Sequence, residues 1–404
     1  MTDYKGGMRT TLFLHSSADL YGADRCLLKI VDVCRDSRPL VVVPYDGPLV
    51  AELRRIKVDH VIRPLAVMRR QCLTPWGLIG LGVAAIRDIF QLGALVRRES
   101  VELVYSNTTA IIMGGVVARL NGLRHIQHVR EIIQTPRLVG WFISQLGRLA
   151  DRVVCVSDAT RRNYVSFCPA LSSRTVVIHD GIDLETFKNG EGRLFRAHLK
   201  VPHDALIVGM IGRFSSWKGQ DFFVNAAEEF VRRYPARKVC FVIVGNAFRG
   251  QEWREKALLE RIESSAARPY FRVVQFREDV ADILASFDIF TMPSTRPDPF
   301  PNTVLEAMSS SKAIVANASG GVVEMLDRES GILIEPNHID ELCLAWERLA
   351  SDPALRVALG KAACARVKAH FTLSGHLAHI HDLIRAVSDW TPGTKMGGAF
   401  DEAN

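Results

Sequence analysis

Residues 206–219 read Leu-Ile-Val-Gly-Met-Ile-Gly-Arg-Phe-Ser-Ser-Trp-Lys-Gly. The apolar run that ends at Ile211 predicts a buried strand, and the glycines let the backbone turn tightly. We expect a helix to begin near Gln220, so that its free amides lie beside Arg213 and Lys218. Such a turn could hold a diphosphate without a metal ion, but an ordinary strand–helix turn with two surface cations explains this stretch equally well.

The same strand–turn–helix pattern recurs along the chain. We predict strands at 10–14, 40–43, 58–62, 103–105, 126–129, 153–157 and 176–178, and then at 206–211, 239–244, 271–275, 289–292, 313–316 and 331–334. Helical spacing fills the intervals, at 24–34, 77–98, 109–121, 138–149, 221–233, 252–267, 280–286, 303–309, 322–326 and 339–351. Short strands that alternate with helices indicate mostly parallel sheets covered on both faces. We therefore predict an α/β chain of two doubly wound halves joined near residues 183–200, with a ligand crevice at the carboxyl ends of the strands.

The composition is that of an ordinary globular protein. The 404 residues are 48% apolar, and the net charge of +7 favours partners that carry phosphate. The eight cysteines lack metal-site spacing and are expected to be reduced thiols. The N-terminal residues lack the apolar core of a signal peptide, and the most apolar stretch, 76–86, is too short at eleven residues to span a bilayer. We expect a cytoplasmic protein that could touch the inner face of a membrane.

Two further segments follow predicted strands in the second half. Residues 293–308 read Pro-Ser-Thr-Arg-Pro-Asp-Pro-Phe-Pro-Asn-Thr-Val-Leu-Glu-Ala-Met, with Asn302 as the expected N-cap and Glu306 one turn into the helix. Carboxylates such as Asp298 and Glu306 suit paired sugar hydroxyls because each accepts two hydrogen bonds at once. Residues 319–324 read Ser-Gly-Gly-Val-Val-Glu, and the paired glycines would let a ligand lie against the backbone. Taken alone, each segment is also explained as a plain turn beside a helix.

In this order, each at a strand end, the three segments resemble the retaining GT-B glycosyltransferases of family GT4 over most of residues 205–375. The N-terminal half is similar more weakly, at Leu20-Tyr-Gly-Ala-Asp-Arg, His128-Val-Arg-Glu131, Val154-Cys-Val-Ser157 and His179-Asp-Gly-Ile-Asp183. The resemblance implies two Rossmann-like domains facing each other across a cleft. Residues 1–185 would bind the acceptor and 186–375 the nucleotide sugar, with a C-terminal helix at 376–391 packing back on the N-terminal domain and a disordered tail at 392–404.

The resemblance also implies a role for each matching residue. Arg213 and Lys218 would bind the donor diphosphate, and Glu306 would bind the ribose. Asp298 would hold sugar hydroxyls near the reacting carbon, and His128 would approach the sugar from the N-terminal domain. The implied catalytic set is Asp298, His128, Arg213 and Lys218. Further donor contacts would come from Phe300, Pro301, Asn302, Thr303, Val304, Gly245 and Val280, while Gly22 would line the acceptor side.

Two positions depart from the family pattern. Asp298 stands where the family has Glu, so its contact with the sugar could shift or run through water. Ala23 follows Gly22 where many members have two glycines, which leaves the backbone less freedom to approach a ligand.

The implied reaction is transfer of a sugar from a nucleoside diphosphate sugar to a hydroxyl of a glycan or lipid-linked glycan, with retained configuration, as in synthesis of cell-surface polysaccharide. No Asp-x-Asp motif follows a suitable strand, so we expect neither a metal nor another cofactor, and the cations would stabilise the leaving diphosphate. Retention would follow from front-face attack, and a covalent intermediate on Asp298 is the alternative. An isomerase or hydrolase of nucleotide sugars with the same architecture is the main rival.

Other classes fit less well. A dinucleotide-dependent dehydrogenase needs Gly-x-Gly-x-x-Gly after the first strand, where this chain has His15-Ser-Ser-Ala-Asp. A periplasmic sugar-binding protein would need a signal peptide. We expect no nucleic-acid partner, because the chain has no recognised module for one.

Arginines lie near apolar stretches in the N-terminal half. The stretches are 76–86 and 138–149, and the arginines are Arg69, Arg70, Arg97, Arg98, Arg119 and Arg124. This combination could serve peripheral contact with an anionic membrane that carries a lipid-linked acceptor. We prefer the alternative, in which these are core helices with solvated arginines.

Overall fold

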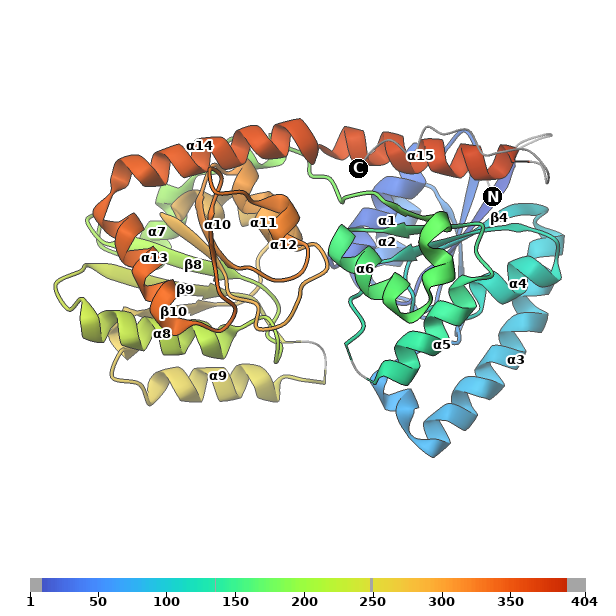
Figure 1. Ribbon diagram of the computed structural model, residues 1–404, viewed down its shortest axis with the longest axis horizontal. Coiled ribbons are helices and arrows are strands. Elements are labelled where there is room, and N and C mark those ends of the chain that lie inside the picture. Colours follow the sequence, from blue (N-terminus) through green and yellow to red (C-terminus); the bar gives the residue numbers. More distant parts are fainter. Residues whose placement is uncertain (1–8, 135, 248–249, 391–404) are drawn as a thin grey trace. The chain divides into compact units, whose positions relative to one another are not determined.

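The computed structural model describes residues 9–134, 136–247 and 250–390. The chain forms two compact units (Figure 1). Unit 1 comprises the residues up to Asp180 and those from His376 onward, and unit 2 comprises Gly181–Gly375. The first boundary, after Asp180, lies just before residues 183–200, which were predicted as the join, and part of that stretch forms helix α7 (Gly192–His198) of unit 2. The predicted tail at 392–404 falls outside the described residues.

Unit 1 contains a seven-stranded parallel sheet in the order β3-β2-β1-β4-β5-β6-β7. Its strands are β1 (Thr10–Leu14), β2 (Arg38–Val43), β3 (Asp59–Ile62), β4 (Val101–Ser106), β5 (Arg124–Val129), β6 (Arg152–Cys155) and β7 (Thr175–Val177). Its helices are α1 (Gly22–Val33), α2 (Pro48–Arg55), η1 (Arg70–Leu73), α3 (Pro75–Arg98), α4 (Gly114–Leu120), α5 (Arg137–Gly147), α6 (Asp158–Phe167), η2 (Pro169–Arg174) and, from His376 onward, α15 (Leu373–Asp389). The central strand β1 is buried along its whole length, as expected for a sheet covered on both faces.

Unit 2 contains a six-stranded parallel sheet in the order β10-β9-β8-β11-β12-β13. Its strands are β8 (Leu206–Ile211), β9 (Val239–Val244), β10 (Phe271–Val274), β11 (Ile289–Met292), β12 (Ala313–Asn317) and β13 (Ile332–Ile334). Its helices, besides α7, are η3 (Glu185–Phe187), α8 (Gln220–Arg233), α9 (Trp253–Glu263), η4 (Arg268–Tyr270), α10 (Val280–Ser286), α11 (Asn302–Ser309), α12 (Val322–Met325), α13 (Ile339–Ser351) and α14 (Pro353–His370). Aromatic side chains fill its core, where Trp346 packs against Phe223 and Phe241.

Both sheets reverse their strand order at one point. In unit 1 the reversal lies between β1 and β4, and in unit 2 it lies between β8 and β11. Ligands of open α/β sheets bind beyond the carboxyl ends of the strands at such a point, because the connections there run in opposite directions. In unit 2, the turn that follows β8 and the loop that follows β11 are the first two predicted segments.

The C-terminal helix α15 packs against the sheet of unit 1. Ile380, Leu383 and Val387 belong to the same buried cluster as Phe13 and Val41. An apolar stripe on one side of the helix thus completes the core of the N-terminal unit, although it lies at the other end of the chain.

Two predictions about the first half need correction. The helix expected at 109–121 begins only at Gly114, because the hydroxyls of Thr108 and Thr109 both donate to Glu131 and hold the chain in a turn. Residues 76–86, which we expected to be too short to span a bilayer, belong to the 24-residue helix α3. By length and composition alone, α3 is long and apolar enough to cross a membrane.

Candidate functional site

The three predicted segments meet at the carboxyl ends of β8, β11 and β12 in unit 2. The Thr295 amide donates to the carbonyl of Trp217 at 2.8 Å, which joins the second segment to the first. The Gly321 amide donates to the carbonyl of Asp298 at 2.8 Å, which joins the third segment to the second. The structure therefore brings the three segments together as one site.

Two glycines permit these contacts. Gly219 and Gly320 have φ values of +83° and +71°, a region that side chains rarely adopt. A Cβ atom at Gly320 would lie 2.1 Å from the carbonyl oxygen of Asp298, and one at Gly219 would lie 1.9 Å from that of Pro293. We expected the paired glycines at 320–321 to admit a ligand to the backbone. The space where a Cβ of either glycine would lie is instead occupied by the backbone of Asp298 and Pro299.

We expect Gly320→Ala to destabilise unit 2 by about 1–3 kcal/mol, because both its φ value and the Asp298 backbone oppose a side chain. Denaturant unfolding of the full chain measures the loss. Gly250→Ala is the matched control, since Gly250 has a similar φ of +82° and no heavy atom within 4 Å of its Cβ position. Equal losses in the two variants would show that the contact between the loops contributes nothing.

Lys218 and Asp298 form an ion pair inside this site. The Lys218 Nζ donates to Asp298 Oδ2 at 2.5 Å, and the two side chains are 20% and 8% exposed. The ammonium also lies 4.5 Å from the centre of the Trp217 ring, at the distance of a cation–π contact. Two residues that the sequence assigned separately to phosphate and sugar therefore contact each other. The pair is largely shielded from water. Each charged group therefore needs an opposite charge beside it, which either its partner or a ligand can supply.

The turn that carries Arg213 is fixed by the start of α8. The Gln220 side chain is buried and its Nε2 donates to the carbonyl of Arg213 at 2.9 Å. Gly219 is the N-cap, so the first-turn amides of α8 follow Lys218 directly. The backbone of Arg213 and residue Lys218 therefore lie at the start of α8, and the binding of a diphosphate by their two cations stays a prediction.

Helix α11 begins one residue earlier than predicted. Pro301, not Asn302, is the N-cap, because Pro301 has extended backbone angles and Asn302 already lies in the helix. Phe300 and Val304 are buried, and the Phe300 ring packs 5.6 Å from that of Phe371. Their side chains belong to the core, so only their backbone atoms suit a ligand. Glu306 is half-buried on α11.

Gly245 follows β9, and Val280 begins α10. A Cβ at Gly245 would lie 2.0 Å from the carbonyl oxygen of Gly212, so Gly245 packs against the Arg213 turn. Val280 is the first residue of α10. Just before it, Arg277 pairs with Asp279 and holds the pKa of that carboxyl below its ordinary value.

In unit 1, a buried hydrogen-bond network holds the loop that leads to Gly22. Asp24 accepts from the Tyr21 amide at 2.8 Å and lies 2.6 Å from Nε2 of His15. Burial would raise the pKa of Asp24, but the contact with His15 and the hydrogen bonds from Ser17 and the Tyr21 amide together outweigh burial and lower the pKa. Gly22 itself is exposed and is the first residue of α1. Sequence reasoning missed His15 and Asp24. The one local signal was an acid at the third position of a helix, where it can accept from the N-cap amide.

His128 is wholly buried. Its Nδ1 lies 2.7 Å from the Tyr105 hydroxyl and its Nε2 lies 3.4 Å from Nη1 of Arg130. Burial holds its pKa well below the ordinary value of 6.5, so the ring is neutral. In this conformation the ring offers no surface to a sugar, and its donor contact stays a prediction.

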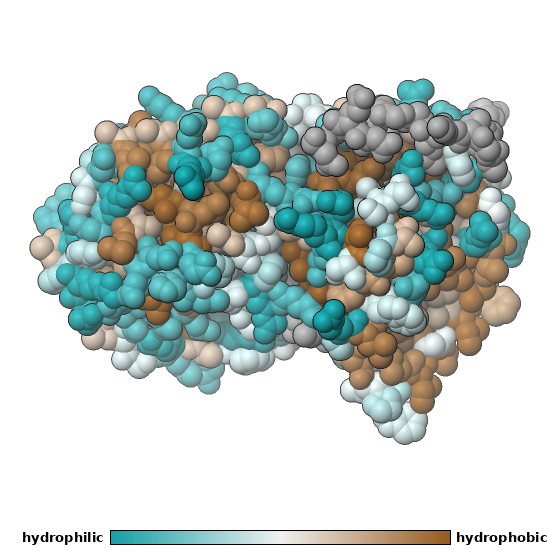
Figure 2. Space-filling view, in the orientation of Figure 1, coloured by the Kyte–Doolittle hydropathy of each residue, from teal (hydrophilic) through white to brown (hydrophobic). Residues whose placement is uncertain are grey.

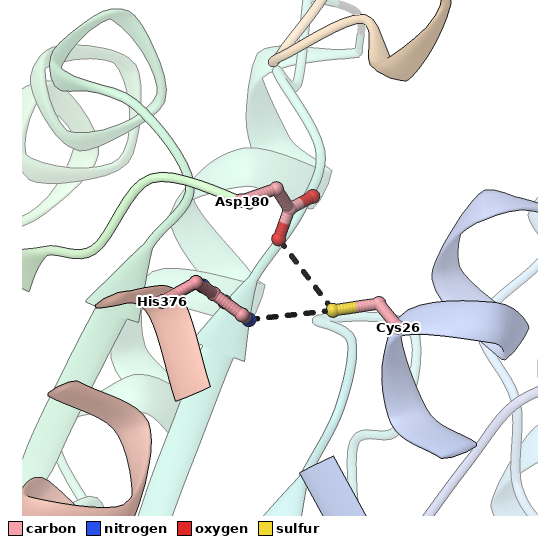
Figure 3. Close-up of side chains that lie close together, drawn as sticks. All are labelled: Cys26, Asp180 and His376. Atoms are coloured by element: carbon pink, nitrogen blue, oxygen red, sulfur yellow. Dashed lines mark hydrogen bonds between the residues drawn. The ribbon is translucent and has the colours of Figure 1, made fainter. Parts of the chain in front are cut away.

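Cys26, Asp180 and His376 lie together and come from three distant parts of the chain (Figure 3). Cys26 Sγ is 3.6 Å from both Asp180 Oδ1 and His376 Nε2. These residue types can bind metals. However, Arg130 donates to Asp180 and its Nη1 lies 3.5 Å from Cys26 Sγ, so the guanidinium already supplies the cation. Burial raises the pKa of Cys26 to about 12, which keeps the thiol protonated, and all eight cysteines are free. The cluster fits a neutralised ion pair better than a metal centre.

Two parallel α/β sheets, with a cation turn and an acidic loop at the reversal point of the second, define the GT-B class of fold. Solved structures agree. A glycosyltransferase from Rickettsia africae matches 96% of this chain and 100% of its own with a TM-score of 0.81 at 17% identity. Anabaena HepE, solved in complex with UDP-glucose, matches 93% of this chain and 99% of its own with a TM-score of 0.81 at 23% identity.

Sequence comparisons name the family. Glycosyltransferase family 4 matches residues 38–186, and glycosyl transferases group 1 matches residues 205–352. Together these matches span more than half of the chain. The chain belongs to the family 4, or group 1, glycosyltransferases.

Curated relatives point the same way. A D-inositol 3-phosphate glycosyltransferase from Kineococcus radiotolerans is 31% identical over 238 residues, which are 55% of this chain and 54% of the relative. A UDP-Gal:alpha-D-GlcNAc-diphosphoundecaprenol alpha-1,3-galactosyltransferase from Escherichia coli is 24% identical over 284 residues, 67% of this chain and 72% of the relative. The chain thus spans about half the length of the inositol-phosphate enzyme that it matches.

Proposed function

We propose that this chain is a retaining glycosyltransferase that moves a sugar from a nucleoside diphosphate sugar to a hydroxyl of a glycan or lipid-linked glycan. The observation that carries the proposal is the shielded pair of Lys218 and Asp298 beside the Arg213 turn and the N-terminus of α8. The lipid-linked substrate in the name of the Escherichia coli relative supports an acceptor of that class. Such an acceptor is consistent with an enzyme that acts in the cytoplasm, at the inner face of a membrane, in the synthesis of cell-surface polysaccharide.

The ion pair suggests how a donor would be received. A diphosphate brings negative charge to the α8 amides and would compete with Asp298 for the Lys218 ammonium. Once released, Asp298 would accept hydrogen bonds from sugar hydroxyls. Charge develops on the leaving diphosphate as the bond to the anomeric carbon breaks, and Lys218 and Arg213 would stabilise that charge. With two cations and helix amides in place, we propose that no metal ion or other cofactor takes part.

Retention of configuration is proposed to follow from attack on the face that the diphosphate leaves. The bond from the anomeric carbon to the phosphate oxygen breaks, and the bond to the acceptor oxygen forms. The acceptor hydroxyl gives its proton to the departing phosphate. This route needs no protein base, which is consistent with the pairing of Asp298 to Lys218.

The test is nucleotide binding followed by turnover. UDP, GDP and ADP are screened for thermal stabilisation, since a nucleotide that binds the native state raises the unfolding temperature. The matching nucleotide sugars are then incubated with and without glycan acceptors. Release of diphosphate only with an acceptor supports a transferase. Release without one indicates a hydrolase, and interconversion of the sugar indicates an isomerase.

We expect Glu306→Gln to weaken binding of the stabilising nucleotide about 10- to 100-fold, because a carboxylate bond to ribose hydroxyls is worth about 1.5–3 kcal/mol. Calorimetric titration measures the change. Glu260→Gln, on the exposed side of α9, is the matched control and should bind as the unmodified chain does. Equal affinity in both variants would remove Glu306 from the nucleotide site.

A further inference from the structure

Helix α3 of unit 1 presents a stripe of exposed apolar side chains. Trp76, Ile79, Val83, Ile86 and Phe90 are 82%, 59%, 64%, 59% and 71% exposed. Their spacing alternates between three and four residues, which places them along one side of the helix for about four turns. Isolated exposed apolar residues are ordinary, but a continuous row is not.

The first half of α3 contributes little to the core. Between Pro75 and Arg87 the structure buries only Leu81, whereas Leu92, Leu95 and Val96 in the second half are core residues. The preferred interpretation of this stretch as an ordinary core helix is therefore wrong for its first half. The burial pattern leaves the stripe exposed while the second half anchors the helix to unit 1.

A second exposed group continues the surface on α5. Leu138, Trp141 and Phe142 are exposed there. Met68, in the segment before α3, packs against the core clusters that lie beneath both helices. Figure 2 shows the brown apolar surface over α3 and α5. We call these eight residues, the five on α3 and the three on α5, the apolar face.

The segments that carry the apolar face are strongly basic. Residues 63–98 and 132–148 contain eight arginines, no lysine and one acid, Asp88. Their net charge of +7 equals that of the whole chain, so the rest of the sequence is neutral in sum. Asp88 is buried and accepts from the Ala66 amide at 2.6 Å, so it presents no charge to the outside. The exposed arginines include Arg69, Arg97, Arg137 and Arg148, whereas Arg98 pairs with Glu99 at the end of α3.

We propose that the apolar face docks unit 1 onto an anionic lipid bilayer. Exposed aromatic and aliphatic side chains enter the region between head groups and acyl chains, and the surrounding arginines attract the anionic head groups. The helix lies in the plane of the surface and does not span the membrane, because its second half and Asp88 are part of the protein core. A second copy of the chain is the poorer occupant, since it would bring two clusters of arginines together without acids to pair them. The proposal does not rest on the proposed transfer reaction, because binding to lipid is measured without any sugar.

The experiment is sedimentation of the full-length protein with vesicles. One set contains phosphatidylcholine alone and the other contains equal parts of phosphatidylcholine and phosphatidylglycerol. The apolar variant is Ile79→Gln/Val83→Gln/Ile86→Gln, which keeps good helix formers at exposed positions. The charge variant is Arg69→Gln/Arg137→Gln. The matched control is Leu344→Gln/Val357→Gln, at residues of unit 2 that are 57% and 55% exposed.

We expect salt-sensitive binding to the anionic vesicles. The charge variant should bind about five-fold more weakly for each arginine removed, and the apolar variant at least about a hundred-fold more weakly. The control should bind as the unmodified chain does. The proposal fails if the unmodified chain ignores anionic vesicles, if it binds both lipids equally at all salt concentrations, or if the control loses binding as the apolar variant does. It also fails if sedimentation without lipid shows a dimer that the apolar variant turns into a monomer, since the occupant is then a second copy.

Discussion

Replacing Lys218 with alanine is expected to lower the turnover of sugar transfer by about two to three orders of magnitude. The variant removes a cation that would face the leaving diphosphate and leaves the shielded carboxylate of Asp298 without its partner. Because the charge on the leaving group grows in the transition state, the loss should fall mainly on kcat. Arg213→Ala should show a loss of similar kind. The measurement is release of nucleoside diphosphate at saturating donor and acceptor.

Controls separate chemistry from folding in this experiment. Lys256→Ala removes an exposed lysine that pairs with Glu260, one turn along the same helix. This variant should leave turnover unchanged. Lys218→Ala/Asp298→Asn removes both charges, so a fold that suffers from the unpaired carboxylate recovers its stability while turnover stays low. If Lys218→Ala and Arg213→Ala transfer sugar as fast as the unmodified chain does, the assignment of the donor site is wrong.

Replacing Arg130 with methionine is expected to destabilise unit 1 by about 3–5 kcal/mol, because Asp180 is then a buried charge without a partner. Asp180 is buried, and the ion pair with Arg130 is nearly closed to water. Thermal unfolding should shift by roughly 10 °C for a unit of this size. Arg161→Met, which breaks a half-exposed pair with Asp158, should cost about 0.5 kcal/mol or less.

The effect of Arg130→Met should depend on pH with a definite sign. Burial would raise the pKa of Asp180, but the charge and hydrogen bond of Arg130, together with the neighbouring His376 and His128, outweigh burial and hold the pKa below the ordinary value of 3.8. The pair therefore stabilises unit 1 above about pH 3.8, and its contribution is lost as the pH falls through the lower pKa of the folded state. In the variant, protonation relieves the unpaired carboxylate. The gap in stability between the two chains should therefore narrow in acid, and Arg130→Met/Asp180→Asn should regain most of the loss at neutral pH. A constant gap across pH would show that Arg130 acts through packing alone.

The strands were predictable because their signal is local. A strand covered on both faces must be apolar at every position, and β8, β9 and β11 begin and end at the residues expected from their apolar runs. The α11 start was predicted one residue late, because Asn302 looked like a cap while Pro301 takes the extended backbone that a cap requires. The helix at 109–121 was predicted too long, because the hydrogen bonds from Thr108 and Thr109 to Glu131 join residues more than twenty positions apart.

The candidate site was predictable in part. Arg213, Lys218, Asp298 and Glu306 stand in segments with recognisable spacing, so the sequence indicated each of them. The contacts among these residues could not be predicted from the sequence. Lys218 and Asp298 are eighty positions apart, and pairing between them depends on the reversal of strand order at β8 and β11. Position 320 likewise requires glycine because the backbone of Asp298 passes beside it, and this contact is also absent from the local sequence.

The sequence by itself determined two parallel α/β halves and the three segments proposed to bind the donor, because apolar periodicity and strand-end glycines are local features of the sequence. Only the tertiary structure decided that Arg130 pairs with Asp180 and that Cys26 and His376 join them. The tertiary structure also decided which side of α3 meets the core. A helical stripe of apolar residues looks the same in the sequence whether it is buried or exposed, and the difference depends on what packs against it. The apolar face is therefore visible only in the folded protein, where unit 1 covers one half of α3 and leaves the other half open.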